Sequence, residues 1–380
     1  MPILRVILTT QRLGTAATLA MTPQAPQVNP FINRRRWLAK AASTTGAMMA
    51  APWVLAQARR VRLRMLLNTG YSSPQAWLWL AQSRGYLERE GIELDLTPGE
   101  GAYTAAPRMI DGGYDIGYGD VNSLIEECAR RPNAAPQGVY MMFNASPSCV
   151  VVANEGPVHQ PKQLVGRKLI GHDSDVALRT FGALCLHQGI DRRAVQVNGA
   201  FSGMAGMVED VLANRADGAF GYVSTFTGAL TSAAPGLLSK VRFLTFAEFA
   251  PDLYGSVLMA SRRLLRENPA AVSGLVRALN LGVLDMLRDQ EAGLDALARV
   301  VPGVDRRAER ARLHATLDLE MNPALPIRSQ RLGLGEVEEP RMKRVIDLLA
   351  RANQLERLPA VSDVFTPAFL PPEVERVRPA

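Results

Sequence analysis

Residues 85–120 read GYLEREGIELDLTPGEGAYTAAPRMIDGGYDIGYGD, and they alternate strand-forming with helix-forming segments. Residues 91–99 alternate apolar and polar side chains with the period of two that is typical of a half-buried strand. A helix is predicted over 104–111 and a second strand over 114–120, with glycines between the segments, where helices commonly end. Strand, helix and strand at this spacing predict an α/β fold with a parallel sheet and right-handed crossovers.

The same alternation continues on both sides of this stretch. Upstream, "VRLRMLLN" (61–68) reads as a strand, and one helix is predicted over 75–90, capped by Ser73 with Pro74 in its first turn. Downstream segments repeat the pattern, with strands predicted in 138–144, 148–154, 166–172 and 256–260, a strand ending near Tyr222, and a long helix opening at Asn268-Pro269. The chain therefore contains two halves of βα type.

The N-terminal region has the composition of an export signal. Three arginines at 34–36 precede an apolar stretch, 41–55, which is shorter than the roughly 20 residues that a spanning helix needs. Residues 56–58 read Ala-Gln-Ala, the pattern of a signal-peptidase site. The order of basic and apolar residues resembles a twin-arginine signal. We therefore expect residues 1–58 to be an N-terminal extension and signal peptide that directs the chain to the periplasm, with a soluble basic arm as the alternative.

Charge and cysteine content narrow the class of protein further. The chain carries a net charge of +7, and residues 1–58 hold six basic and no acidic side chains, which leaves +1 on the rest. A nucleic-acid-binding domain would need a basic face of its own, so no nucleic-acid partner is expected. Cys128, Cys149 and Cys185 form no C-x-x-C pair and are expected to be buried apolar side chains. No segment after Ala58 is expected to span a membrane.

Several motifs then carry a family likeness. The region 77–127 contains Gly85-Tyr86-Leu87, a Gly-Glu-Gly loop at 99–101 and "GYDIG" at 113–117. The second half contains "QPKQLVGRKLIG" (160–171) and "VEDVLANRADGAFGY" (208–222). In this order and spacing, the motifs resemble the NMT1/THI5-like periplasmic substrate-binding proteins of ABC importers, a group that includes nitrate, sulfonate and taurine binding proteins. Gln163 and Arg167 stand where the family usually has Asp and Lys.

The resemblance implies a two-lobed type II periplasmic-binding-protein fold, with two chain crossings near 144–148 and 246–254. The expected division is lobe 1 in 59–146, lobe 2 in 147–248, and the rest of lobe 1 with C-terminal helices in 249–380. A small-molecule ligand would bind in the cleft between the lobes, and hinge closure would present it to an ABC permease in the inner membrane. We expect a monomer that uses no cofactor and no metal.

Candidate ligand-binding residues lie in the loops that follow strands, where open α/β sheets bind ligands. They are Tyr71, Ser73, Trp77, Glu100, Gly101, Asp120, Asn122, Ser146, Ser148, Asp173, Ser174 and Tyr222. Some have an equally good structural interpretation. Trp77 is either a cleft or a core residue, Gly101 serves either a ligand or a turn, and Asp120, Asp173 and Ser174 either contact ligand or cap a helix.

The charges in this set favour one class of ligand. Glu100, Asp120 and Asp173 are acidic, no Arg or Lys follows a strand, and facing carboxylates oppose an anion. Carboxylates with aromatic rings suit a planar ligand that donates N–H groups. The hypothesis is therefore a neutral or cationic, pyrimidine-like heteroaromatic; within the resembled family the example is the aminopyrimidine precursors of thiamine. The alternative is a sulfonate, nitrate or another small anion.

Catalytic motifs are missing from the sequence. The four histidines have no metal-binding spacing, and no G-x-S-x-G elbow or P-loop is present. The resemblance nevertheless includes one enzyme class, eukaryotic pyrimidine synthases that sacrifice a histidine and carry a cysteine-rich motif. This chain has no cysteine cluster. We predict a binding protein rather than an enzyme; a soluble sensor with the same closure would give the same sequence signals.

Overall fold

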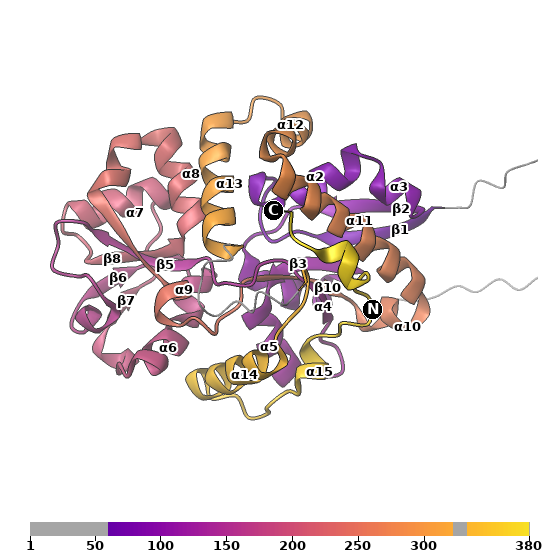
Figure 1. Cartoon of the computed structure of the whole chain (residues 1–380). Helices are drawn as coiled ribbons and strands as arrows, with labels where there is room; N and C mark the ends of the chain where they lie inside the picture. The colour runs from indigo at the N-terminus through magenta and orange to yellow at the C-terminus, as the bar shows by residue number, and fades with distance from the viewer. Residues whose placement is uncertain (1–59, 322–332, 380) are drawn as a thin grey trace, which may run out of the picture. The chain divides into compact units, whose positions relative to one another are not determined.

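The computed structural model describes residues 60–321 and 333–379. The expected signal peptide lies outside the described residues. Two five-stranded sheets dominate the described part, in the orders β2-β1-β3-β10-β4 and β7-β6-β8-β5-β9. Figure 1 shows them side by side, with helices packed around both.

The first sheet is mixed rather than parallel. Its strands are β1 (Val61–Leu66), β2 (Ile92–Thr97), β3 (Ile116–Asp120), β4 (Gln137–Met141) and β10 (Ser256–Ala260). β2, β1 and β3 are parallel, as expected, but β10 runs antiparallel to both β3 and β4. The predicted parallel pairing of the first three strands is therefore confirmed, and the sheet as a whole is mixed because β10 enters from the second sheet and not through a βαβ crossover.

The second sheet repeats this arrangement. Its strands are β5 (Ser148–Ala153), β6 (Lys168–Ile170), β7 (Gln196–Asn198), β8 (Gly218–Tyr222) and β9 (Val241–Thr245). β5 is antiparallel to β8 and β9 and occupies the place that β10 has in the first sheet. The chain passes between the sheets after β4 and after β9, so the predicted α/β fold with two crossings is confirmed. The assignment of residues to lobes stays a prediction.

Helices connect and flank the strands. The short 3-10 helices are η1 (Ser73–Gln75), η2 (Ala102–Thr104), η3 (Pro161–Leu164), η4 (Arg192–Ala194), η5 (Pro235–Lys240) and η6 (Glu373–Arg376). The α-helices before β10 are α2 (Ala76–Ser83), α3 (Tyr86–Arg89), α4 (Ala105–Gly112), α5 (Val121–Arg130), α6 (Val176–Gln188), α7 (Gly203–Leu212), α8 (Val223–Ala233) and α9 (Phe246–Phe249). After β10 come α10 (Arg262–Glu267), α11 (Pro269–Arg288), α12 (Gln290–Val300), α13 (Arg306–Glu320), α14 (Glu339–Asn353) and α15 (Val361–Val364).

The first helical segment differs from the single helix predicted over 75–90. Gly85 adopts a left-handed conformation with φ 68° and separates α2 from α3, because only glycine takes this conformation without a steric cost. The N-cap residue of this segment, at the start of η1, is Ser72 and not the predicted Ser73. The Ser73 hydroxyl instead donates to the carbonyl oxygen of Glu309, at 2.7 Å.

The core of the first sheet includes the contact between α2 and α11. A Cβ atom placed on Gly282 would lie 2.0 Å from the carbonyl oxygen of Trp77, so glycine allows the two helices to approach this closely. Among the described residues, α11 alone is long and apolar enough to cross a membrane, contrary to our expectation from the sequence. Two-thirds of it (67%) is buried inside the fold, as in a core helix of a soluble protein.

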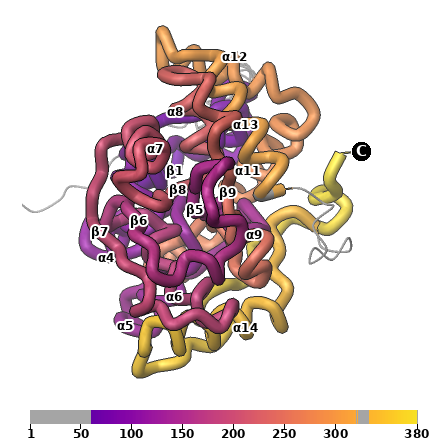
Figure 2. The backbone as a smooth tube through the Cα atoms, turned by 90° about the vertical axis from the view of Figure 1, so that its left-hand side faces the viewer, coloured from indigo at the N-terminus to yellow at the C-terminus, as the bar shows by residue number. Residues whose placement is uncertain are grey.

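Two C-terminal helices pack against helices of the second sheet. α13 packs on α8, and Figure 1 shows them adjacent. α14 packs on α6 and on α5, and Figure 2 shows α14 beside α6 from a second direction. Both helices follow β10 in the chain, so the polypeptide reaches the second sheet again after leaving it at β9.

Candidate ligand-binding site

A cavity of about 220 Å³ is lined by segments from both sheets. Its walls come from the loop after β1, from β3 and β10, from the segment after β4, from the junction of β8 and α8, and from α13. The lining residues are Asn68, Thr69, Gly70, Tyr71, Ser72, Pro74, Tyr118, Phe143, Tyr222, Ser224, Thr225, Ser256 and Arg312. Of the predicted site residues, Tyr71 and Tyr222 are in this group.

The loop after β1 is held in shape by buried side chains behind it. Gln75 Nε2 donates to Asn68 Oδ1 at 2.7 Å, while Gln75 Oε1 accepts from the Ser72 backbone N–H at 3.3 Å. Trp79 Nε1 donates to the Ser72 carbonyl oxygen at 3.0 Å. The Trp79 ring also meets the Tyr71 ring edge-on, with centroids 5.1 Å apart. These contacts order the loop before any ligand binds, which lowers the entropy cost of binding.

Aromatic rings form a large part of the cavity wall. Tyr71, Tyr118, Phe143 and Tyr222 all line it. Trp77, a predicted site residue, does not reach the cavity: it is fully buried and packs edge-on behind Tyr118, with ring centroids 5.1 Å apart. The structure therefore places Trp77 in the core, and it supports the wall from behind.

Arg312, on α13, brings a positive charge to the cavity that the sequence analysis missed. Its Nη1 lies 3.1 Å from Glu309 Oε1, and a quarter of its side chain is exposed (25%). Its Nε is buried and has no hydrogen-bond partner within the described part of the chain. A buried guanidinium N–H without an acceptor is costly. This Nε lies against α8, where a Cβ atom on Gly228 would be 2.8 Å from it, while Arg312 as a residue lines the cavity and gives it a positive charge.

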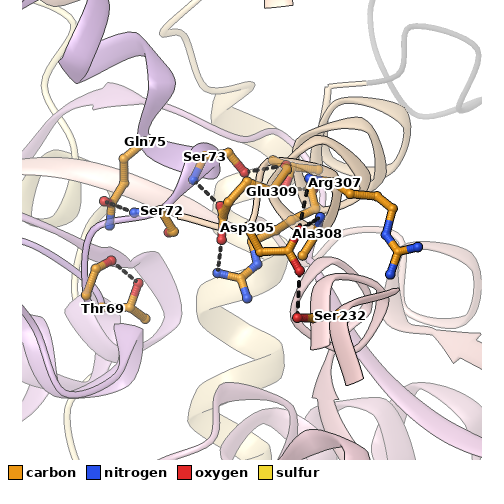
Figure 3. Close-up of polar contacts among 12 residues, drawn as sticks. Thr69, Ser72, Ser73, Gln75, Ser232, Asp305, Arg307, Ala308 and Glu309 are labelled. Carbon is orange, nitrogen blue, oxygen red and sulfur yellow. Dashed lines mark hydrogen bonds and ion pairs between the residues drawn. The ribbon is translucent and has the colours of Figure 1, made fainter. Parts of the chain in front are cut away.

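Glu309 connects α13 to the loop after β1. Its Oε2 accepts from the Ser73 backbone N–H at 2.7 Å, and its carbonyl oxygen accepts from the Ser73 hydroxyl (Figure 3). Ser73, a predicted site residue, is thus occupied by α13 and does not line the cavity. Its contacts hold Glu309, and through Glu309 they position Arg312.

The beginning of α13 is also bonded to α8. Ser232 Oγ donates to Asp305 Oδ2 at 2.7 Å, and Arg307 Nη2 donates to the carbonyl oxygen of Thr231 at 2.7 Å. Figure 3 shows Ser73 above Asp305 in the view and Ser232 below it. α13 therefore joins the loop after β1 to α8, and all three contribute residues to the cavity wall.

Asp120 lies next to the cavity wall and caps a helix. Its Oδ1 accepts from the backbone N–H groups of Asn122 (2.9 Å) and Ser123 (3.4 Å), at the start of α5. It stands directly opposite Ser256 in the β3–β10 pair, so both side chains are on one face of the sheet. Desolvation raises the pKa of Asp120 to about 7, despite the opposing hydrogen bonds from Asn122 and Ser123.

Two oxygen atoms at this helix start have no partner. Asp120 Oδ2 and Asn122 Oδ1 are buried and make no hydrogen bond to any residue that the structure describes. Asn122 Nδ2 donates to the carbonyl oxygen of Tyr254 at 3.3 Å. Asp120 and Asn122 therefore lie together as predicted, beside the cavity and not among its lining residues.

The remaining predicted site residues form two other groups. Ser148 N donates to Ser146 Oγ at 3.3 Å, and Ser148 stands opposite Tyr222 in the β5–β8 pair. A Cβ on Gly101 would lie 3.3 Å from Ser174 Oγ, so these two loops touch. Neither residue lines the cavity, but Gly101 N donates to the carbonyl oxygen of Asn68, a lining residue, at 2.9 Å.

The acidic members of the predicted set lie outside the cavity. Glu100 is exposed and lies 3.5 Å from Arg108, and Asp173 is exposed. A helix cap was one of two interpretations of Asp173 and Ser174, but the cap of α6 is Asp175, which accepts from the N–H groups of the first turn. The cavity thus combines one guanidinium, several hydroxyls and four aromatic rings. The described residues contain no cluster of three metal-binding side chains.

Comparisons with known proteins agree with the resemblance seen in the sequence. The model of the NMT1/THI5-like family matches residues 74–292, while no curated protein sequence matches the chain. One similar solved structure is the alkanesulfonate-binding protein SsuA from Xanthomonas axonopodis bound to MOPS (TM-score 0.59, 16% identity, 81% of this chain and 99% of that chain covered). Another is the aliphatic sulphonate binding protein SsuA from Escherichia coli (TM-score 0.59, 14% identity, 80% and 97% covered).

An enzyme also shares the fold. DSZB in complex with biphenyl-2-sulfinic acid, titled a desulfurization enzyme, matches with a TM-score of 0.57 and 16% identity, over 83% of this chain and 100% of that chain. At these identities the structural likeness establishes the periplasmic-binding-protein fold, which binding proteins and an enzyme both use. The family match covers more than half of the sequence and confirms the predicted resemblance: the chain belongs to the NMT1/THI5-like family.

Proposed function

We propose that this protein is the extracytoplasmic solute-binding component of an ABC importer. It holds one small molecule in the 220 Å³ cavity, and closure of the two sheet-bearing halves presents that molecule to a membrane permease. The observation that carries this proposal is a cavity whose walls come from both sheets, because a ligand there contacts both halves at once. Family membership supports it. We propose that the protein acts as a monomer.

The finer part of the proposal is a small anion with a flat or apolar body. The anionic group accepts a hydrogen bond from the guanidinium of Arg312, and the body lies against Tyr71, Tyr118 and Tyr222. Neighbouring hydroxyls, such as that of Ser224, supply neutral donors. This differs from the hypothesis drawn from sequence, which depended on Glu100, Asp120 and Asp173. None of these three carboxylates lines the cavity.

A second candidate is the neutral, pyrimidine-like heteroaromatic. Two observations favour it: the aromatic wall suits a planar ring, and Asp120 Oδ2 is an unpartnered acceptor beside the wall among the described residues. A ring N–H would satisfy that acceptor. The two candidates make opposite demands on Arg312, because only the anion requires its charge.

Calorimetric titration separates the candidates. The panel contains an aromatic sulfonate, an alkanesulfonate, an aromatic carboxylate and an aminopyrimidine, titrated into the wild type and Arg312→Met. We expect an anion to bind the wild type and to lose about 10- to 150-fold in affinity in the variant, because a charge-assisted hydrogen bond contributes about 1.5–3 kcal/mol. Arg310→Met is the matched control, since Arg310 lies on the same helix and pairs with Glu291 away from the cavity.

Each titration outcome has a clear meaning. Binding of the aminopyrimidine with equal affinity to the wild type and Arg312→Met would replace the anion by the second candidate. Equal loss in the Arg312 and Arg310 variants would show that the effect comes from α13 as a whole. Failure of every compound, with native mass spectrometry showing no co-purified small molecule, would contradict the proposed function.

We propose binding rather than turnover. Burial raises the pKa of the Cys128 and Cys185 thiols to about 12 and that of Cys149 above its ordinary value, which keeps all three protonated and poorly nucleophilic. The four histidines lie in the described part of the chain, and none lines the cavity. A bound ligand recovered chemically unchanged after prolonged incubation supports this; recovery of a product would contradict it.

Export completes the proposal. The signal peptide predicted in residues 1–58 would be cleaved after Ala58 during twin-arginine export to the periplasm. Intact mass analysis of protein from the periplasmic fraction tests this, with a mature N-terminus at Arg59 as the expected result. Substitution of Arg35 and Arg36 by Lys should retain the precursor in the cytoplasm; undiminished export would contradict the twin-arginine assignment.

A further inference from the structure

Arg341 is a buried cation that touches both segments by which the chain crosses between the sheets. It lies on α14 and is only 3% exposed. Its Nη2 donates to the carbonyl oxygen of Asn144 at 2.7 Å, in the first crossing, between β4 and β5. The same guanidinium donates to three consecutive carbonyl oxygens of the second crossing, those of Pro251 (3.1 Å), Asp252 (2.9 Å) and Leu253 (3.0 Å).

The charge of Arg341 is held by backbone carbonyls and an aromatic ring. All of its hydrogen bonds within the described residues go to carbonyl oxygens. Its Cζ lies 3.8 Å from the centre of the Tyr254 ring, in cation–π geometry. The carboxylate of Asp252 instead pairs with Arg344, at 2.9 Å. Burial lowers the pKa of Arg341, but an arginine remains charged at any physiological pH.

The two crossings also contact each other directly. Gly255 N donates to the carbonyl oxygen of Phe143 at 3.2 Å. A Cβ atom on Gly255 would lie 2.7 Å from the carbonyl oxygen of Ala145, so the two backbones are in close contact there. A planar guanidinium fixes several acceptors in one geometry. Arg341 therefore holds together two backbone segments that are about 100 residues apart in the chain.

We infer that Arg341 is a positioning residue that fastens the two crossings into a single pivot, and thereby sets the resting angle between the two sheets. The crossings are the segments that connect β4 to β5 and β9 to β10, so relative motion of the two sheets must change the backbone conformation there as well as the packing of α13 and α14. The inference depends on the proposed function in one respect only, which is that the motion serves to capture a ligand.

Distances between spin labels test the pivot without any ligand. Cysteines introduced as Glu93→Cys on β2 and Gln196→Cys on β7 are exposed and lie on different sheets. The three native thiols are 0–1% exposed and should not label in the folded protein. We expect Arg341→Met to widen the interlabel distance distribution about twofold relative to the labelled parent. Arg344→Met is the control, because Arg344 lies about one turn further along α14 and its hydrogen bonds, among the described residues, go to the side chain of Asp252 and not to backbone carbonyls of either crossing.

Hydrogen exchange distinguishes a pivot from a general anchor of α14. In Arg341→Met, amides of residues 142–147 and 246–255 should exchange at least about tenfold faster, with α14 itself little changed. An unchanged distance distribution, or faster exchange confined to α14, would overturn the inference. Arg341→Lys retains the charge but donates to fewer carbonyls, so its interlabel distance distribution should have an intermediate width. This variant replaces Arg341→Met in the test if the Met variant does not fold.

The pivot and the proposed function fail in different ways. A widened distribution in Arg341→Met, together with no ligand found by titration, would support the pivot and reject solute binding. Ligand binding with an unchanged distribution would support solute binding and reject the pivot.

Discussion

Replacing Asp120 by Asn should make the stability of the protein less dependent on pH. Asp120 is fully buried beside the cavity, and desolvation raises its pKa from 3.8 to about 7. Asparagine is as good a helix cap as aspartate, so the hydrogen bonds to Asn122 and Ser123 at the start of α5 should persist. The substitution therefore removes the titration and keeps the local structure.

The sign and size follow from proton linkage. Between pH 4 and 7 the unfolded chain loses the Asp120 proton while the folded chain keeps it, so the wild type loses stability as pH rises. At about 1.36 kcal/mol per pKa unit, the shift of roughly three units corresponds to about 4 kcal/mol. Above pH 7 the effect is complete. Asp120→Asn should thus gain about 4 kcal/mol relative to the wild type between pH 4 and pH 8.

Urea unfolding at closely spaced pH values measures this difference, and two other helix caps provide the comparison. Burial raises the pKa of Asp175 to about 6, so Asp175→Asn should show a smaller gain, about 3 kcal/mol, complete one pH unit earlier. Asp305 is exposed and hydrogen bonds lower its pKa, so Asp305→Asn should have the opposite sign and lose stability above pH 4. A wild-type minus Asp120→Asn difference that is flat from pH 4 to 8 would refute the reasoning.

Three further outcomes are expected. Gly282→Ala should lower the free energy of unfolding by about 1–3 kcal/mol, because its Cβ would lie 2.0 Å from the Trp77 carbonyl oxygen. Gly182→Ala, whose nearest contacts are at 3.7 Å, should raise it by up to about 1 kcal/mol. Thermal unfolding measures both, and the reverse order would contradict the described packing. Glu309→Ala should lose about 2 kcal/mol or more in urea unfolding, since it leaves Arg312 and the Ser73 N–H unpaired, and a neutral result would deny that contact. The native protein should resist a thiol reagent and react at all three cysteines after denaturation; reaction of any thiol in the folded state would contradict their burial.

The sequence predicted the elements well wherever local chemistry determines them. Alternating apolar residues located β2, the second strand was predicted over 114–120 where β3 lies, and the glycines between segments marked where helices end. The same reasoning missed the break at Gly85, because a helical glycine and a helix-ending glycine look alike without the backbone conformation. It predicted the parallel arrangement of β1, β2 and β3 but not the antiparallel direction of β10, which depends on the return from the second sheet.

The candidate site was harder to predict because it is assembled by packing. A polar residue at a strand end can either contact a ligand or cap the next helix, and Asp120 caps α5 beside the cavity. Arg312 follows Glu309 on a helix rich in charged side chains, and a sequence gives no sign of which charged residue faces inward. The contact of Glu309 with Ser73, in the loop after β1, joins residues more than 230 positions apart. Trp77, for which the sequence left a cleft and a core interpretation open, is buried in the core.

The position of β10 has a consequence for how the chain folds during synthesis. Residues 148–245 supply every strand of the second sheet, so that sheet is complete as soon as this continuous segment has been made. β4, by contrast, pairs within its sheet only with β10, which is synthesised more than 100 residues later. The edge of β4 must remain open throughout that interval, and an unpaired edge strand is prone to association with other chains. The N-terminal half of this molecule is thus the last to be completed. The unpaired edge of β4 most needs a chaperone's protection in the period before β10 has been synthesised.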